Sequence, residues 1–202
     1  MIVDERRDRN LFRRLTRRNL LWQYDFLIDS IHIGLDRRSK LTDYIIRSLN
    51  FFAVVNIADG PGVVRNDDVH IEGAEHQPPG HQDVGRAYLE FIPHLHEIWD
   101  QWDALHVAAY VLWKVNWIHP FLEGNGRTAR AAMYYALSIK MGRILKGRNP
   151  IPDQIRRSPP RYYELLRSTD HTFRAGHLDL GPLAEYLGEL LEQQLASSVQ
   201  RT

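Results

Sequence analysis

Helical periodicity dominates this chain and restricts it to a fold built mainly from α-helices. Apolar residues recur three and four positions apart, as they do on one face of a helix, in the series Ile98, Trp102, Leu105, Ala109 and Leu112. Similar spacing recurs in Tyr134, Leu137, Met141 and Leu145, and in Leu183, Leu187, Leu190 and Leu191. Pro182 suits the first turn of the last helix, and residues 20–33 and 41–55 are also expected to form buried helices. We therefore predict an all-α fold, organised as a compact helical bundle.

One stretch interrupts this helical pattern. Residues 59–80 are rich in Gly, Pro and Asp, and they contain two short β-prone pieces, 63–65 and 69–71, on either side of Asn66-Asp67-Asp68. This order is typical of a small β-hairpin. A lone hairpin is only marginally stable, so it should either pack on the helical body or serve as an exposed arm for a partner.

The composition excludes several classes of protein. The chain has 202 residues, which suits one domain, and it has no cysteine for a disulfide framework, a thiolate zinc site or a cysteine nucleophile. Its net charge of +1 gives no global attraction to nucleic acid or membrane. We find neither a membrane-spanning run nor a secretory signal. These features predict a cytoplasmic protein, although effectors secreted by other routes carry no such signal.

The N-terminal region is expected to be a helical segment, residues 1–40, that packs on a core spanning 41–202. Its first 18 residues carry seven arginines, interleaved with three acidic residues. We interpret this pattern as a solvated helix face, with a contact to nucleic acid or a partner as the alternative.

The residues that carry chemistry lie together at 119–130, here called the signature segment. Pro120 disfavours helical backbone at His119, so the preceding helix should end there. Gly124 and Gly126 allow backbone conformations closed to other residues, and a new helix should start at or just after Gly126. The free N–H groups at such a helix start attract anions. Two arginines spaced i, i+3, Arg127 and Arg130, could clamp a polyphosphate beside them.

Two further side chains of the signature segment fit phosphate chemistry. Glu123 would repel a phosphate unless a divalent cation lay between them, and Mg²⁺ commonly takes one or two carboxylates together with phosphate oxygens. His119 titrates near neutrality and is the natural general base of such a cluster. Each of these residues taken singly is usually structural. Their combination within twelve residues indicates a single site.

The signature segment, His-Pro-Phe-Leu-Glu-Gly-Asn-Gly-Arg-Thr-Ala-Arg, resembles the Fic-family signature His-x-Phe-x-Asp/Glu-Gly-Asn-Gly-Arg-x-x-Arg at every defined position. The resemblance extends over about residues 41–191. It implies the Fic fold, a helical bundle with a short β-hairpin flap beside the active site, and the stretch at about 61–73 is similar to that flap.

The resemblance also implies an activity, transfer of AMP from ATP to a Ser, Thr or Tyr hydroxyl of a target protein. His119 would be the general base, Phe121 a structural anchor in the core, and Glu123 the ligand of Mg²⁺. The phosphates of ATP would be bound by Gly124, Asn125, Gly126, Arg127 and Arg130. The flap would pair with the main chain of the target, through contacts drawn from Val63, Val64, Val69 and Ile71.

Regulation is where this sequence departs from many Fic proteins. Several are held inactive by a helix bearing Ser/Thr-x-x-x-Glu-Gly/Asn, but here no Ser or Thr is followed four residues later by Glu. Control by a separate small antitoxin-like protein, control by other means, and constitutive activity all stay open. Because the same glutamate accompanies AMP removal in some relatives, we expect transfer and not removal.

Other functions compete with AMP transfer. Doc-type phosphotransferases carry lysine where this chain has Gly126, which favours nucleotidyl transfer here. UMP or GMP transfer stays open because base-binding residues lie outside the signature. A non-catalytic ATP-binding module is the alternative from another class, although such a module would be expected to lose His119 or an arginine. His94 and His96 lack a third ligand nearby, so we expect no metal site there.

Overall fold

The computed structural model describes residues 8–71 and 73–198, and within these ranges it contains helices and loops but no strand. The helices are α1 (Arg9–Arg37), α2 (Asp43–Val54), α3 (His81–Ile98), α4 (Ala104–Ile118), α5 (Asn125–Lys140), α6 (Ile151–Arg157), α7 (Pro159–Arg174) and α8 (Gly181–Ala196). The predicted all-α bundle is confirmed. Pro182 lies in the first turn of α8, as expected.

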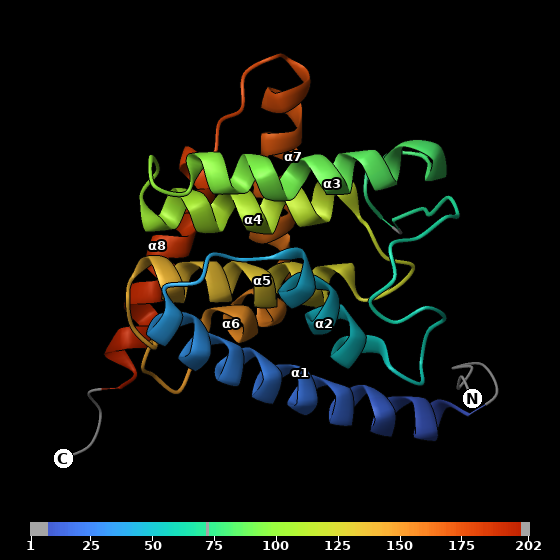
Figure 1. Ribbon diagram of the computed structural model, residues 1–202, viewed down its shortest axis with the longest axis horizontal. Coiled ribbons are helices and arrows are strands. Elements are labelled where there is room, and N and C mark those ends of the chain that lie inside the picture. The colour runs from blue at the N-terminus through green and yellow to red at the C-terminus, as the bar shows by residue number, and fades with distance from the viewer. Residues whose placement is uncertain (1–7, 72, 199–202) are drawn as a thin grey trace.

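Two helices, α4 and α5, form the centre of the bundle and pack side by side (Figure 1). Both are buried along most of their length because small and apolar residues occupy nearly all their faces. α1 and α2 cover α5, while α3, α7 and α8 pack on α4. The signature segment therefore connects the two most buried helices of the molecule, which fixes its ends firmly.

The break between α3 and α4 corrects one predicted series. α3 ends at Ile98, and Trp102 lies in the turn that follows, so these two residues do not share a helix with Leu105. The physical reason is a new helix start at Asp103, whose Oδ1 accepts from the N–H groups of Leu105 (2.9 Å) and His106 (3.0 Å). A capping carboxylate at this place outweighs the continuity of the apolar pattern.

Two other helix predictions need smaller corrections. α5 ends at Lys140, before Gly142 with its positive φ of 65°, so Met141 and Leu145 lie beyond the helix. The helix predicted at 20–33 is part of α1, but it is less buried than expected, because Leu21 is 65% exposed and Ile33 is 55% exposed. The buried stripe of α1 consists of Asn19, Gln23, Leu27, Ile31 and Gly34.

The predicted hairpin at 61–73 is not formed in the residues that the structure describes there, 61–71 and 73. Its backbone groups bond elsewhere. Val63 N–H donates to Gly60 O (2.9 Å) and Ala74 N–H to Ile71 O (3.1 Å), while Arg65 N–H donates to Pro120 O (2.8 Å). The two β-prone pieces are only three residues long. Backbone N–H and C=O groups that would pair the two strands of a hairpin are instead hydrogen-bonded within turns and to the signature segment. The described part of the flap is therefore a loop.

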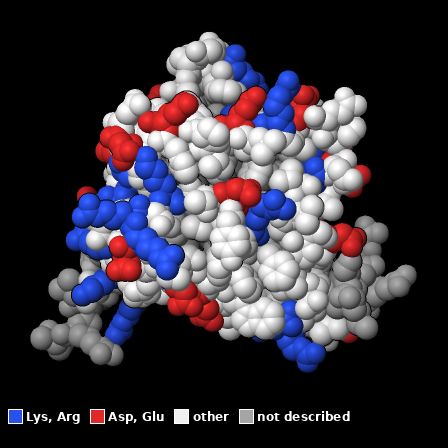
Figure 2. Space-filling model, viewed as in Figure 1, with Lys and Arg blue, Asp and Glu red and all other residues white. Residues whose placement is uncertain are grey.

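Charge is mixed on the surface. On the face in Figure 2, Lys and Arg gather at the left, at the end of the molecule where α1 and α5 terminate in Figure 1, with acidic residues among them. Arg37 in the last turn of α1 and Lys140 in that of α5 fit the favourable position of cations at helix C-termini. Residues 1–7 of the predicted arginine-rich segment lie outside the described residues. No described helix combines the length and the apolar character needed to cross a bilayer.

Candidate active site

α4 presents His119 at its C-terminal end. The helix ends at Ile118, and His119 follows with left-handed backbone, φ 50° and ψ 58°, while its N–H still donates to Val115 O (3.0 Å). Such backbone is uncommon for a residue other than glycine and is concentrated at functional sites. The prediction that this helix ends before Pro120 is confirmed.

The imidazole of His119 is arranged to act as a base. Nδ1 lies 3.2 Å from the carbonyl oxygen of Asn116, and this pairing places the proton on Nδ1 and leaves Nε2 with a lone pair. The pKa of His119 is lowered to about 4, mainly by burial and also by the nearby Arg65 and His76, while the hydrogen bond to Asn116 acts in the opposite direction. His119 is therefore neutral near pH 7, which a general base requires.

Asn125 closes the loop between α4 and α5. Its side chain is buried, Oδ1 accepts from Phe121 N–H (2.9 Å), and Nδ2 donates to Phe121 O (2.7 Å). Phe121 is itself buried, with its ring centroid 6.1 Å from that of Tyr88 in an edge-on contact. In this structure the amide of Asn125 therefore fixes the loop, and its predicted contact with a phosphate stays a prediction.

The two glycines of the signature segment have different roles. Gly124 has φ 78°, and a Cβ there would lie 2.5 Å from Val54 Cγ1. Gly126 is not among the glycines with left-handed backbone, but a Cβ there would lie 3.3 Å from Arg130 Nη1. The prediction of unusual backbone is thus confirmed for Gly124 and wrong for Gly126. At Gly126 the absence of a side chain leaves room for the guanidinium of Arg130.

Substitution of Gly124 by alanine should both destabilise the protein and distort the site. The alanine would carry about 1–2 kcal/mol of left-handed strain and, because it overlaps Val54, about 1–3 kcal/mol of overpacking. Thermal unfolding should show a melting temperature lower by about 5–15 °C. Gly142→Ala is the matched control, since φ is 65° and nothing lies within 4 Å of its Cβ. Equal losses in the two variants would contradict the role given to Val54.

The N-terminus of α5 is open to an anion. α5 begins at Asn125, close to the predicted start, and no side chain caps its first turn. Its first N–H groups can therefore donate hydrogen bonds to an anionic ligand. Arg130 reaches back over Gly126, whereas Arg127 donates Nη1 to Ala53 O at 2.7 Å and burial lowers its pKa. Both arginines lie in the first two turns of α5, and the guanidinium of Arg127 is hydrogen-bonded to α2.

Glu123 supplies the carboxylate of the signature segment, and it is exposed. Its carbonyl oxygen accepts from Asn50 Nδ2 (2.8 Å), which holds the main chain in place beneath the side chain. Within the described residues, no group of three or more His, Cys, Asp or Glu side chains could hold a metal ion. One carboxylate with phosphate oxygens is enough for Mg²⁺, so Glu123 fits this ion only when a nucleotide is also bound.

Arg65 braces His119, and nothing in the sequence singles it out. Its buried guanidinium donates to the carbonyls of His119 (2.8 Å), Asp67 (2.7 Å) and Pro79 (2.6 Å). A longer contact reaches Ile118 O (3.5 Å), so the cation lies at the C-terminus of α4, where the helix dipole favours it. An arginine in a short segment between turns is usually exposed to solvent, and the sequence around Arg65 gives no sign that its side chain is buried.

Asn50 is the second residue that sequence reasoning missed. Buried in α2, it donates Nδ2 to Glu123 O (2.8 Å) and Thr128 Oγ1 (3.2 Å), and its Oδ1 accepts from Gly62 N–H (2.9 Å). It thus ties three segments together at the base of the site. A weak signal existed, because a lone amide among the apolar residues of 45–55 must find partners when buried.

A cavity of about 220 Å³ adjoins His119. Its walls come from α4, from α7 and from the loop residues Ile71, Gly73, Ala74 and His76, and they include Tyr163 and Leu166. Of the other flap residues predicted to contact a target, Val63 is 53% exposed, Val64 packs against the core and Val69 is half-buried. The four therefore do not share one face, and Ile71 is the one that lines this cavity.

A larger hollow of about 510 Å³ lies apart from the signature segment, between α3, α4 and α7. Trp117 lines both spaces, so its indole forms part of the wall between them. The smaller cavity is the one that the chemistry of His119 can use, because no residue of 119–130 lines the larger one.

Comparisons with known proteins agree with this geometry. A model of the Fic/DOC family matches residues 40–137, from just before α2 to near the end of α5. The chain contains a Fic/DOC family domain. Protein adenylyltransferase Fic from Drosophila persimilis is 31% identical to it over 139 residues, which are 66% of this chain and 24% of that protein. The chain thus spans about a quarter of the length of the curated relatives that it matches.

Solved structures share the fold of this Fic/DOC chain. A Fic domain containing signaling protein from Bacteroides thetaiotaomicron superposes with a TM-score of 0.71 at 18% identity, covering 89% of this chain and 70% of that one. Fic-1 from C. elegans gives a TM-score of 0.69 at 19% identity, covering 98% and 54%. The Fic fold expected from the signature segment is therefore confirmed.

Proposed function

We propose that this chain is a protein adenylyltransferase, which transfers AMP from ATP to a Ser, Thr or Tyr hydroxyl of a target protein. One observation carries the proposal, namely a neutral His119 with its Nε2 lone pair, held in the same short segment as the uncapped start of α5. The names of the similar Drosophila proteins support it.

The proposed reaction is an in-line displacement at the α-phosphate. His119 Nε2 takes the proton of the target hydroxyl, and the oxygen forms a bond to the α-phosphorus. The bond from the α-phosphorus to the bridging oxygen breaks, and pyrophosphate leaves. The first N–H groups of α5 would stabilise the charge that develops on the α-phosphate, while Arg127 and Arg130 would hold the leaving group.

The cavity beside His119 is the proposed site of the nucleotide base. Its apolar and aromatic walls, which include Tyr163, Leu166 and Ile71, suit the flat face of a base. Discrimination between AMP and UMP or GMP would then depend on the polar groups of this cavity, among them Asp170 and Arg167.

Three further elements belong to the same proposal. Glu123 would hold Mg²⁺, which supplies charge neutralisation on the phosphates when it is bound. A separate antitoxin-like protein as the inhibitor and the cytoplasm as the location both stay predictions from sequence.

The decisive experiment labels proteins with ATP in two positions. Purified chain, lysate, Mg²⁺ and either α-³²P or γ-³²P ATP are incubated, and His119→Ala is run beside wild type. AMP transfer keeps the α label and releases the γ label in pyrophosphate. Labelling by the γ position would indicate phosphoryl transfer instead. Bound ATP without any protein labelling would favour the non-catalytic module.

A further inference from the structure

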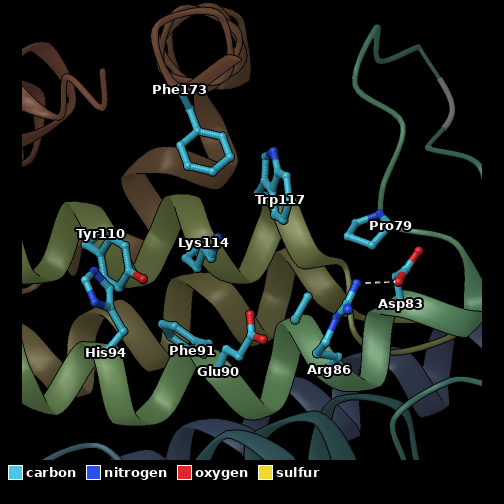
Figure 3. Close-up of a pocket in the computed structure, with 11 residues that line it drawn as sticks. Pro79, Asp83, Arg86, Glu90, Phe91, His94, Tyr110, Lys114, Trp117 and Phe173 are labelled. Carbon is cyan, nitrogen blue, oxygen red and sulfur yellow. Dashed lines mark hydrogen bonds and ion pairs between the residues drawn. The ribbon is translucent and has the colours of Figure 1, made fainter. Parts of the chain in front are cut away.

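A second hollow, here called the α3–α4 groove, has features that no part of the adenylyl transfer reaction uses. It measures about 510 Å³, within the range of small-molecule sites. Figure 3 shows its aromatic lining, with Phe91 from α3, Tyr110 and Trp117 from α4, and Phe173 from α7. Aromatic faces of this kind hold apolar side chains well.

The charged groups of the groove divide into those with partners and those without. Arg86 pairs with Asp83 at 2.7 Å, and His94 contacts Glu97 at 3.4 Å. Lys114 and Glu90 also line the groove, yet neither forms a hydrogen bond or ion pair with any described residue. Two opposite charges therefore face one space without being joined to each other.

Among the residues that the structure describes, three aromatic rings surround the ammonium of Lys114. Its Nζ lies 4.3 Å from the ring centroid of Trp117, 5.0 Å from that of Phe173 and 5.2 Å from that of Trp113. Burial lowers the pKa of Lys114, and Glu90 acts in the opposite direction. A partly desolvated ammonium of this kind gains most from an anion that enters the groove.

We propose that the α3–α4 groove binds a free α-amino acid with an apolar side chain. Its carboxylate would pair with Lys114, its ammonium with Glu90, and its side chain would rest on the aromatic lining. An α-amino acid carries an ammonium and a carboxylate on the same carbon atom, so it can pair with Glu90 and Lys114 together, which a simple anion or cation cannot do. The site is distinct from the ATP site of the proposed function, and its test needs no nucleotide.

The test is a titration followed by two-dimensional ¹H–¹⁵N NMR, using the indole N–H of Trp117, assigned with Trp117→Phe, as the reporter. The ligands are L-phenylalanine, N-acetyl-L-phenylalanine without the ammonium, and phenethylamine without the carboxylate. L-Phenylalanine should bind most tightly. Lys114→Met should weaken N-acetylphenylalanine by about tenfold and leave phenethylamine unchanged, and Glu90→Gln should do the reverse.

Lys146→Met is the matched control, because Lys146 is exposed in the loop after α5 and does not line the groove. Melting temperatures show whether each variant is folded. Equal affinities of the three ligands, no effect of Lys114→Met in a folded variant, or no shift at about 10 mM ligand would each overturn the proposal. Failure of protein labelling by ATP would leave these results unaffected.

Discussion

Replacement of His119 by alanine is expected to lower the rate of AMP transfer by about 10²- to 10⁴-fold, the usual contribution of a general base. The structure supplies the physical reason, since Nδ1 is committed to Asn116 O and only Nε2 is left to accept a proton. Rates should be measured with saturating ATP and Mg²⁺, by release of pyrophosphate or by labelling of a target. Binding of ATP should change much less than the rate, because the phosphates contact α5 in this proposal and His119 is one of several residues that line the cavity of the base.

His119→Asn separates chemistry from backbone in this experiment. The left-handed φ of 50° at this position is tolerated by asparagine better than by alanine. Both variants lack a base, so both should show the same loss of rate, about 10²- to 10⁴-fold, but the asparagine variant should melt closer to wild type. Activity in His119→Asn would show that the backbone, and not the imidazole, limits the rate.

The pH profile tests the same assignment from another side. The pKa of His119 is lowered to about 4, so lowering the pH protonates the base only near that value. The rate should therefore stay level from about pH 8 to about pH 5 and fall toward pH 4, as far as His119 controls it. A fall centred near pH 6.5 would mean that the imidazole titrates as it does in water.

Arg65→Met is expected to produce the largest combined loss of stability and activity outside the signature segment. Methionine keeps the apolar volume but removes the donors to His119, Asp67 and Pro79. The hydrogen bonds to these carbonyls are partly buried, and a carbonyl that is left without a partner away from water costs about 1–3 kcal/mol. The melting temperature should therefore fall by about 10 °C or more. The rate of AMP transfer should also drop by about 10- to 100-fold, because the hydrogen bond that positions the main chain of His119 is lost.

Arg47→Met is the matched control for this variant. Arg47 also donates to a carbonyl near the flap, Gly62 O at 2.8 Å, but its side chain is 44% exposed and makes one such bond. Its loss should shift the melting temperature by only about 2–4 °C. Arg65→Lys should rescue little, since one ammonium cannot replace the planar fork. A melting temperature of Arg65→Met within 2–3 °C of wild type, roughly the effect of one bond, would refute the bracing role.

The sequence predicted most of the helices and the backbone at the ends of the signature segment, because both depend on local pattern. His119 before Pro120 ends α4, and Gly124 needs left-handed backbone, and both follow from the chemistry of single residues. What could not be predicted depends on tertiary partners. The bracing role of Arg65 and the missing hairpin depend on carbonyls of another segment, those of His119 and Pro120. The pairing of the Asn125 amide with Phe121 is local, but the sequence does not show whether a polar side chain turns to its own loop or to a ligand.

The way the site is braced has a consequence for how such a domain can diverge. Arg65, Asn50 and Arg127 each donate from a side chain to main-chain oxygens, which every residue type carries. The accepting positions, such as Asp67 and Ala53, can therefore change identity while the brace persists. The donating positions cannot. The requirement for a particular side chain therefore falls on three donating residues, two of which lie outside the signature segment.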